Sequence, residues 1–159
     1  MRRLCGPEKG VTWLADLRRR QTALALGEML GGMDAILEAT VAYVKEREQF
    51  GQKIAVFQAV QHQVADMATA FTAARHLGWQ AITRIAEGRD EPIDLPGAAA
   101  YVGAACKQLA VTGHHLHGGA GFVVEHPLHY HSERAQSLSI RYTPEGAALA
   151  AVAAVLLDA

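Results

Sequence analysis

The sequence predicts an all-α protein, an antiparallel bundle of four main helices with one short extra helix. No segment shows the period-two alternation of apolar and polar residues that marks a half-buried strand. Glycine and proline clusters separate long helical stretches. In one stretch, apolar or small residues recur in steps of four and three, a repeat of about 3.5 residues that keeps one helix face against its neighbours. These positions are Val60, Val64, Met67, Phe71, Ala74, Gly78, Ala81 and Ile85.

The first helix is expected to follow a loose leader of residues 1–10, because that segment carries glycine and proline without periodicity. Thr12 or Asp16 is the candidate N-cap, and the helix should run to about Arg47. Residues 11–159 then form a single helical domain, since 159 residues suffice for one core. The apolar stripe of this helix comprises Leu26, Met29, Met33, Leu37, Thr40 and Val44.

The second helix is expected over residues 55–88 and the third over residues 97–117. The polar, proline-containing segment 88–96 between them should be a loop. A shorter helix should follow at residues 127–139, since proline is tolerated in a first helical turn, and the last helix should occupy residues 144–157.

Charge and composition exclude several classes of protein. The net charge is −1 with both signs interspersed, so no nucleic-acid partner is expected, and Arg18-Arg19-Arg20 is read as a solvated helix face. The most apolar segment, residues 147–157, is too short to span a membrane, and no apolar run follows the basic N-terminus. We therefore expect a cytoplasmic protein without a membrane partner. Cys5 and Cys106 fit no disulfide scaffold or metal motif and are expected to be reduced thiols.

Two motifs are candidates for binding chemistry. The first is Arg47-Glu48-Gln49-Phe50-Gly51, followed by Phe57-Gln58. Its guanidinium can match two phosphate oxygens at once, although an isolated arginine at a helix end also complements the helix dipole. The second is Gly118-Gly119-Ala120-Gly121-Phe122. Glycines can take positive φ and leave room for a phosphate or ribose, although a glycine run after a helix also serves as a C-cap and turn.

Together these motifs resemble the C-terminal helical domain of the flavin-dependent acyl-CoA dehydrogenases, over most of residues 20–145. Only about the last third of a family chain is present. The resemblance implies FAD as cofactor, with the arginine at its pyrophosphate, the aromatic residue near its adenine and the glycine turn beside its ADP portion. Family members commonly have glutamine where this chain has His115, whose imidazole can still donate one hydrogen bond. The implied cofactor-binding positions are Arg47, Phe50, Gln58, His115, Gly118, Gly119 and Gly121.

The resemblance also implies a position for the catalytic base. In most family members a glutamate removes the α-proton of the acyl thioester while the β-hydrogen passes to the flavin as hydride. Here ungapped counting from the glycine turn places Tyr142 at that position. A phenol with its ordinary pKa near 10 is a poor base at neutral pH. Glu145, expected in the first turn of the last helix, is the other candidate. We expect little or no oxidation of acyl-CoA to 2-enoyl-CoA by this chain alone.

Assembly with other chains is expected on two grounds. Family bundles form dimers of dimers. The repeating apolar face of residues 60–85, together with surface that the absent domains normally cover, favours a homo-oligomer, a dimer or tetramer. Alternatively, the chain is a non-catalytic partner that lends its FAD contacts to a second acyl-CoA dehydrogenase chain in a hetero-oligomer. The tyrosine at the base position is consistent with that alternative.

A histidine-rich metal-binding bundle is a further alternative. Six histidines fall between residues 114 and 131, and Glu125 or Glu133 lies close to them in the sequence. Pairs spaced by three residues can share one helix face and bind zinc. No H-E-x-x-H or cysteine spacing accompanies them, so the prediction names no metal ligand. The histidines are His114, His115, His117, His126, His129 and His131.

Overall fold

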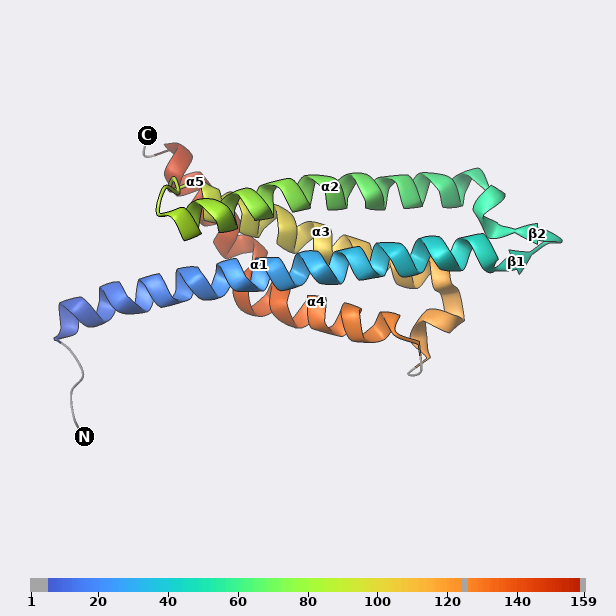
Figure 1. Ribbon diagram of the computed structural model, residues 1–159, viewed down its shortest axis with the longest axis horizontal. Coiled ribbons are helices and arrows are strands. Elements are labelled where there is room, and N and C mark those ends of the chain that lie inside the picture. The colour runs from blue at the N-terminus through green and yellow to red at the C-terminus, as the bar shows by residue number, and fades with distance from the viewer. Residues whose placement is uncertain (1–5, 124–125, 158–159) are drawn as a thin grey trace.

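The computed structural model describes residues 6–123 and 126–157. Four helices run up, down, up and down in an antiparallel bundle, and a fifth lies outside it (Figure 1). The all-α class and the four-helix bundle are therefore confirmed. The helices are α1 (Pro7–Glu46), α2 (Gln58–Glu87), α3 (Asp94–His117), α4 (Leu128–Tyr142) and α5 (Glu145–Leu157). Two short 3₁₀ helices, η1 (Ile54–Val56) and η2 (Gly118–Phe122), and two short strands, β1 (Glu48–Gln49) and β2 (Gln52–Lys53), connect them.

Two helices begin earlier than the sequence predicts. Helix α1 starts at Pro7, inside the expected leader, after an extended Gly6. The fixed φ of proline suits the first helical position, where no backbone hydrogen bond is lost. Helix α3 starts at Asp94 instead of Gly97. The carboxylate of Asp94, in the first turn of the helix, accepts a 2.7 Å hydrogen bond from the Glu91 amide of the preceding loop and suits the positive end of the helix dipole.

The connection between α1 and α2 is a β-hairpin, which the sequence analysis missed. Its strands pair in antiparallel register, Glu48 with Lys53 and Gln49 with Gln52. Phe50 and Gly51 have φ of 56° and 79°, and positive φ at both central residues defines a two-residue type I′ turn. Strands of two residues are too short to show an alternating pattern, so periodicity cannot find them.

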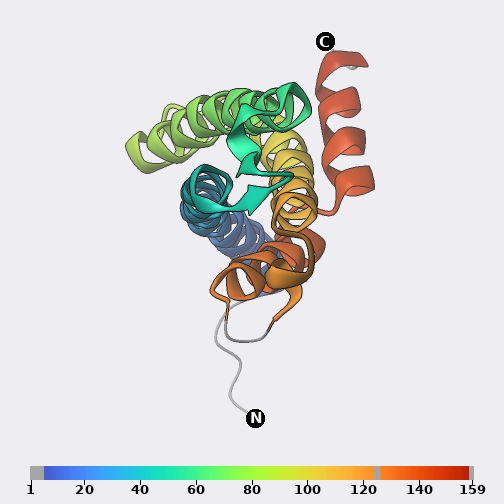
Figure 2. The same ribbon diagram turned by 90° about the vertical axis from the view of Figure 1, so that its right-hand side faces the viewer.

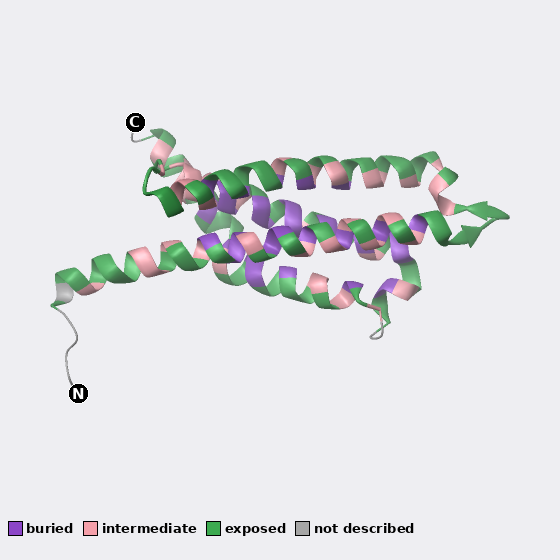
Figure 3. Cartoon of the chain, in the orientation of Figure 1, coloured by how far each residue is buried: buried purple, intermediate pink, exposed green. Residues whose placement is uncertain are grey.

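Helix α3 is the centre of the bundle and contacts each of the other helices (Figure 2). Its buried face packs on the inner face of α1, whereas the N-terminal part of α1 extends beyond the other helices and is mostly exposed (Figure 3). Burial raises the pKa of the Cys106 thiol to about 11, so this cysteine stays protonated. The core includes Leu26, Met29, Met33 and Ile36 of α1 and Val102, Cys106 and Leu109 of α3.

The repeating apolar face of α2 belongs to this same core. Met67, Phe71, Ala74, Gly78 and Ala81 are buried, and α2 packs on both α1 and α3. The predicted packing of this helix is confirmed. Because the chain's own helices cover these five residues, they are not available to a second copy, and the expected homo-oligomer stays a prediction.

The last two helices differ in their place in the fold. Helix α4 packs against α1 and α3 and is the fourth member of the bundle, whereas α5 packs against α3 and buries only Ala148. Within the part of the chain that the structure describes, no single helix has both the length and the apolar composition of a membrane span. The pair α4 and α5, bent by 45° at its junction, meets both criteria only when the two are taken together.

Candidate functional site

The two predicted binding motifs lie at the same end of the bundle. The hairpin follows the last turn of α1, and η2 follows the last turn of α3 (Figure 1). The two ends meet directly, because the rings of Tyr43 and His117 are stacked with their centroids 4.4 Å apart. The fold thus brings together segments about 70 residues apart in sequence, and Arg47 and the glycine turn form one candidate site.

The backbone of Arg47 is held on both sides. Its N–H donates to the carbonyl of Tyr43 at 2.8 Å, and its carbonyl accepts from the amide of Ile54 at 2.9 Å. Its side chain is exposed and forms no ion pair with any carboxylate of the described residues. The neighbouring Glu48 is instead paired with Lys53, at 2.7 Å. The guanidinium therefore remains available for an external anion.

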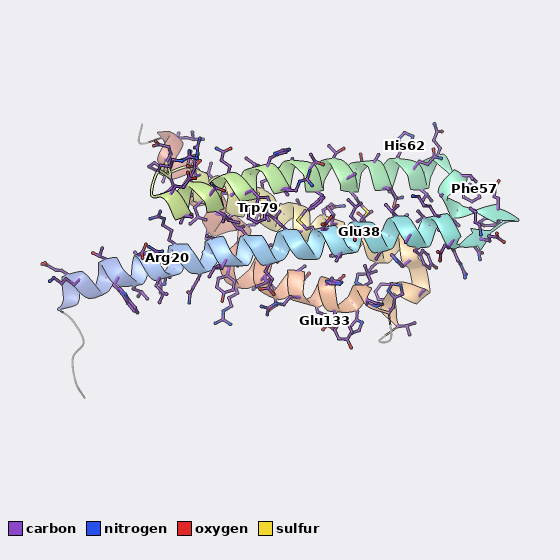
Figure 4. The ribbon with its side chains drawn as sticks, viewed as in Figure 1. Arg20, Glu38, Phe57, His62, Trp79 and Glu133 are labelled. Atoms are coloured by element: carbon purple, nitrogen blue, oxygen red, sulfur yellow. The ribbon has the colours of Figure 1, made fainter. Side chains whose placement is uncertain are left out.

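The tip of the hairpin presents an aromatic side chain to solvent. Phe50 is 91% exposed and has φ of 56°, which is uncommon for a residue other than glycine. Its ring contacts Phe57 edge to face at 6.1 Å, and Figure 4 shows Phe57 at this end of the bundle. Gln58 is the exposed first residue of α2. An aromatic ring and an amide thus lie close in sequence to the free guanidinium.

The three glycines of the turn have different surroundings. Gly118 has φ of 56°, and among the described residues no atom lies within 4 Å of where a Cβ would be at Gly118 or Gly119. Both are exposed. Gly121 is buried, and a Cβ there would lie 3.0 Å from the Cβ of His117. The first two glycines leave an open surface beside the hairpin end, while the third permits close packing. This arrangement fits the approach of a dinucleotide to the first two.

The histidines near the glycine turn serve local structure. The Nδ1 atom of His117 lies 2.8 Å from the carbonyl of Gly113, and that of His129 lies 2.8 Å from the carbonyl of His126. The His126 ring in turn accepts from the Leu128 amide at 3.2 Å. No three metal-ligating side chains of the described residues converge on a point that can hold a metal ion. Glu125, one of the two suggested ligands, lies outside the described residues.

His115 lies one helical turn before Gly118, and its exposed side chain lines a groove of about 510 Å³ between α2 and α3. Sequence reasoning did not single out Tyr43, which joins the two motifs. Its position four residues before Arg47, one turn back on the same helix, is the signal that points to it.

The position implied for the catalytic base lies at the opposite end of the bundle. Tyr142 is the last residue of α4, and Glu145 is the exposed first residue of α5. Tyr142 lines a groove of about 570 Å³ whose described lining includes Arg18 and Arg141 but no carboxylate. The guanidinium carbon of Arg141 lies 5.5 Å from the centre of the Tyr142 ring. Thus the structure does not bring the base candidates near Arg47 of the same chain.

A family model described as acyl-CoA dehydrogenase, C-terminal domain, matches residues 14–156. This chain belongs to the acyl-CoA dehydrogenase family. Mitochondrial isovaleryl-CoA dehydrogenase of Pongo abelii is 33% identical over 120 residues, which are 76% of this chain and 28% of that protein. The family resemblance inferred from the two motifs is confirmed.

Solved structures of acyl-CoA dehydrogenases share the fold. The glutaryl-coenzyme A dehydrogenase in complex with glutaryl-CoA superposes with a TM-score of 0.90 at 26% identity, covering 96% of this chain and 39% of that one. A variant of the Tcur3481-Tcur3483 steroid ACAD gives 0.83 at 30% identity, covering 92% and 40%. Like the isovaleryl-CoA dehydrogenase, these acyl-CoA dehydrogenases are much longer than the present chain, which spans 28–40% of their lengths. Acyl-CoA dehydrogenases are FAD flavoproteins.

Proposed function

We propose that this chain is a cofactor-contacting bundle of an acyl-CoA dehydrogenase assembly, in which its hairpin and glycine turn bind the ADP portion of FAD. The observation that carries the proposal is the meeting of the two motifs at one end of the bundle. There the exposed guanidinium of Arg47 has no carboxylate partner among the described residues, and the surface of Gly118 and Gly119 is open. When bound, FAD supplies the hydride acceptor for oxidation of an acyl-CoA thioester to the 2-enoyl form.

Each residue of the proposed site has a separate task. Arg47 pairs with the pyrophosphate through its planar fork of donors, and Gln58 offers a hydrogen bond to the cofactor. Phe50 packs against the adenine, which removes a fully exposed ring from water and stabilises the complex by about 2 kcal/mol. Gly118 and Gly119 let the backbone approach the ADP portion without side-chain obstruction.

Binding of FAD to the purified chain tests this proposal, with flavin fluorescence as the measurement. Arg47→Ala should weaken binding by about 10- to 100-fold, because a hydrogen-bonded charge contact is lost. Arg141→Ala is the matched control at the other end of the bundle and should leave the affinity unchanged. Wild-type protein that binds no FAD, or equal losses in the two variants, would contradict the proposed cofactor site.

We further propose that the chain acts as a non-catalytic partner, with the base held by a second acyl-CoA dehydrogenase chain. The specific observation is that none of the described residues lining the groove beside Tyr142 is a carboxylate. Glu145 begins α5 and is exposed to solvent, where it can be hydrated. In this assembly the bundle orients the cofactor, while the second chain removes the α-proton.

Reduction of bound flavin by butyryl-CoA distinguishes a non-catalytic partner from an enzyme. The FAD-loaded chain should keep its absorbance near 450 nm after butyryl-CoA is added, because no positioned carboxylate removes the α-proton. Bleaching that is lost in Glu145→Gln would identify Glu145 as the base and reject the non-catalytic role. Bleaching that is lost only in Tyr142→Phe would identify Tyr142 as the base and would also reject the non-catalytic role.

We also propose that the bundle self-associates through its exposed apolar surface, in place of the buried face of α2. Leu149, Leu156 and Leu157 of α5 are exposed by 52%, 66% and 83%. Apolar surface of this kind is favourable to cover in an oligomer. A light-scattering mass of a dimer or tetramer would support the proposal, and a monomer at micromolar concentration would reject it.

A further inference from the structure

We infer that Tyr43 and His117 are positioning residues that hold the arginine hairpin and the glycine turn in one fixed mutual orientation. Their functional role depends on the FAD site proposed above, because both motifs must then reach one dinucleotide. The contact between the two residues is a property of the fold and does not depend on any ligand.

Tyr43 connects to both motifs at once. Its backbone carbonyl accepts the hydrogen bond from the Arg47 amide at 2.8 Å, which ties it to the start of the hairpin. Its hydroxyl donates to the carbonyl of His117 at 3.2 Å, on the residue that directly precedes Gly118. That bond is longer than the usual hydroxyl distance of about 2.7–2.8 Å. The stacking of the two rings, 4.4 Å apart and inclined by 27°, therefore carries much of the contact.

His117 is enclosed by several parts of the chain. It is 2% exposed, and its Nδ1 lies 2.8 Å from the carbonyl of Gly113. Because only a protonated Nδ1 can donate to that carbonyl, Nε2 carries no proton in the neutral ring. This Nε2 is buried and has no hydrogen-bond partner among the described residues. A Cβ on Gly121 would lie 3.0 Å from the Cβ of His117, so the base of this side chain packs closely against the glycine turn.

The consequence is preorganisation of the two motifs. Without the contact, the packing of α1 against α3 would remain to connect the hairpin with the glycine turn. A rigid link means that less conformational freedom is lost when one ligand contacts both. Tyr43 and His117 lie behind the proposed cofactor surface and act on it through Arg47 and Gly118.

Hydrogen exchange on the ligand-free chain tests the link directly. Tyr43→Leu removes both the ring stack and the hydroxyl, so it should accelerate exchange at two amides, that of Ile54, bonded to Arg47, and that of Val123 after the glycine turn. Tyr43→Phe keeps the ring and should restore most of the protection. Tyr101→Leu, at a 40% exposed tyrosine of α3, is the matched control and should leave both amides unchanged.

Titration with FAD supplies the second readout. Tyr43→Leu should weaken binding about fivefold to tenfold with little effect from Tyr101→Leu. If the wild-type chain binds no FAD, the proposed function fails, and the exchange rates still decide whether the link exists. Unchanged exchange at either the hairpin or the glycine turn in Tyr43→Leu would overturn the inference, whatever the FAD result.

A pH profile separates this role from general support of the fold. Burial lowers the pKa of His117, and the nearby His126 and His114 lower it further, despite the opposing hydrogen bond to Gly113. The titratable groups facing the ring are Tyr43 of α1, His114 of its own helix and His126 of the segment before α4. A lowered pKa means that the neutral ring is favoured in the folded chain. The link should therefore be intact above pH 6.5 and be lost as the pH falls through the folded pKa.

The expected profile is a joint loss of FAD affinity and of hairpin and glycine-turn protection below pH 6.5. His117→Asn replaces the titrating ring by an amide that can still donate to Gly113. In this variant the loss of FAD affinity and of amide protection at acid pH, the acid limb of the profile, should be smaller. His62→Asn, at an exposed histidine of α2 near the hairpin, is the control and should retain the acid limb (Figure 4). An unchanged acid limb in His117→Asn would exclude His117 as the positioning group.

Discussion

The two ends of the bundle are built differently. At the hairpin end, Arg47 and Phe50 are exposed and Gly118 has open space beside it. At the α4–α5 junction, Thr143 is 1% exposed and Tyr142 stands where the family base is expected. The proposed cofactor contacts and the position implied for the base therefore lie at opposite ends of this bundle. A substitution at the α4–α5 junction can therefore leave the hairpin end unaltered.

Glycine packing shows the same contrast. A Cβ on Gly103 of α3 would lie 2.6 Å from the Oγ1 of Thr143 and 3.0 Å from its Cβ. The Thr143 hydroxyl is itself engaged, donating to the carbonyl of Ser139 at 3.2 Å. At Gly119 a Cβ would meet no atom of residues 6–123 or 126–157 within 4 Å. Close packing requires glycine at the junction, whereas the surface of the turn at Gly119 stays open for a ligand.

The largest expected effect is that of Gly103→Ala. The added methyl group overlaps Thr143, and the cost should be about 2–3 kcal/mol of unfolding free energy in urea, since α3 and the junction must move apart. Gly97→Ala in the same helix meets no atom within 4 Å and should be neutral or slightly stabilising. Equal stabilities of the two variants would show that contact with Thr143 does not set the effect. FAD affinity, governed by the other end, should survive Gly103→Ala.

Gly118→Val is the corresponding change at the hairpin end. A β-branched residue is strained at φ of 56°, so the variant should lose about 1–2 kcal/mol of stability and bind FAD more weakly. Gly119→Ala lies next to it, without a positive φ, and should change stability much less. Urea unfolding and the flavin titration measure the two effects. Equal stability of the two variants would mean that the turn relaxes to a conformation accessible to all residues.

A smaller effect is expected from Asp94→Asn, at the junction end of the bundle. Burial acts to raise the pKa of Asp94, but the Glu91 amide and the ion pair with Arg84 at 2.8 Å outweigh it and lower the pKa. A lowered pKa in the folded state means that the stabilisation exists above pH 3.8 and is lost as the pH falls through the folded pKa. The variant should lose about 1 kcal/mol of unfolding free energy at pH 7. Its unfolding free energy should also fall less steeply than that of the wild type as the pH is lowered. An equally steep fall would contradict this assignment.

Most of the fold follows from the sequence because it depends on local periodicity. The stepwise apolar face of α2 predicts its buried residues, and the proline at 144 predicts the start of α5 at Glu145. The errors arise at segments whose structure is set by few residues. Pro7 and Asp94 begin their helices through a backbone angle and a single carboxylate contact. The hairpin depends on a two-residue turn that has no periodic signal.

The candidate site could be predicted in part. Local motifs identify Arg47 and Gly118, and the bundle brings their segments to one end. The link through Tyr43 could not be inferred from periodicity, since its partner His117 is distant in sequence and the contact depends on how α1 and α3 align. The base could not be predicted either, because the position implied for it holds Tyr142 and the nearest acid, Glu145, is exposed at the start of α5.

The smallest effect is expected from Glu48→Gln in the hairpin, and its direction is informative. The hydrogen bond and charge of Lys53 lower the pKa of Glu48, so this residue is an anion at neutral pH beside the proposed phosphate-binding arginine. Removing the anion leaves Lys53 unpaired and makes the hairpin more positive, which should tighten FAD binding about twofold at low salt and less at high salt. Glu145→Gln removes an anion at the other end and should not change the affinity. An equal gain in both variants would show that the net charge of the chain alone attracts the cofactor. The two ends would then not differ in their electrostatic effect on FAD binding.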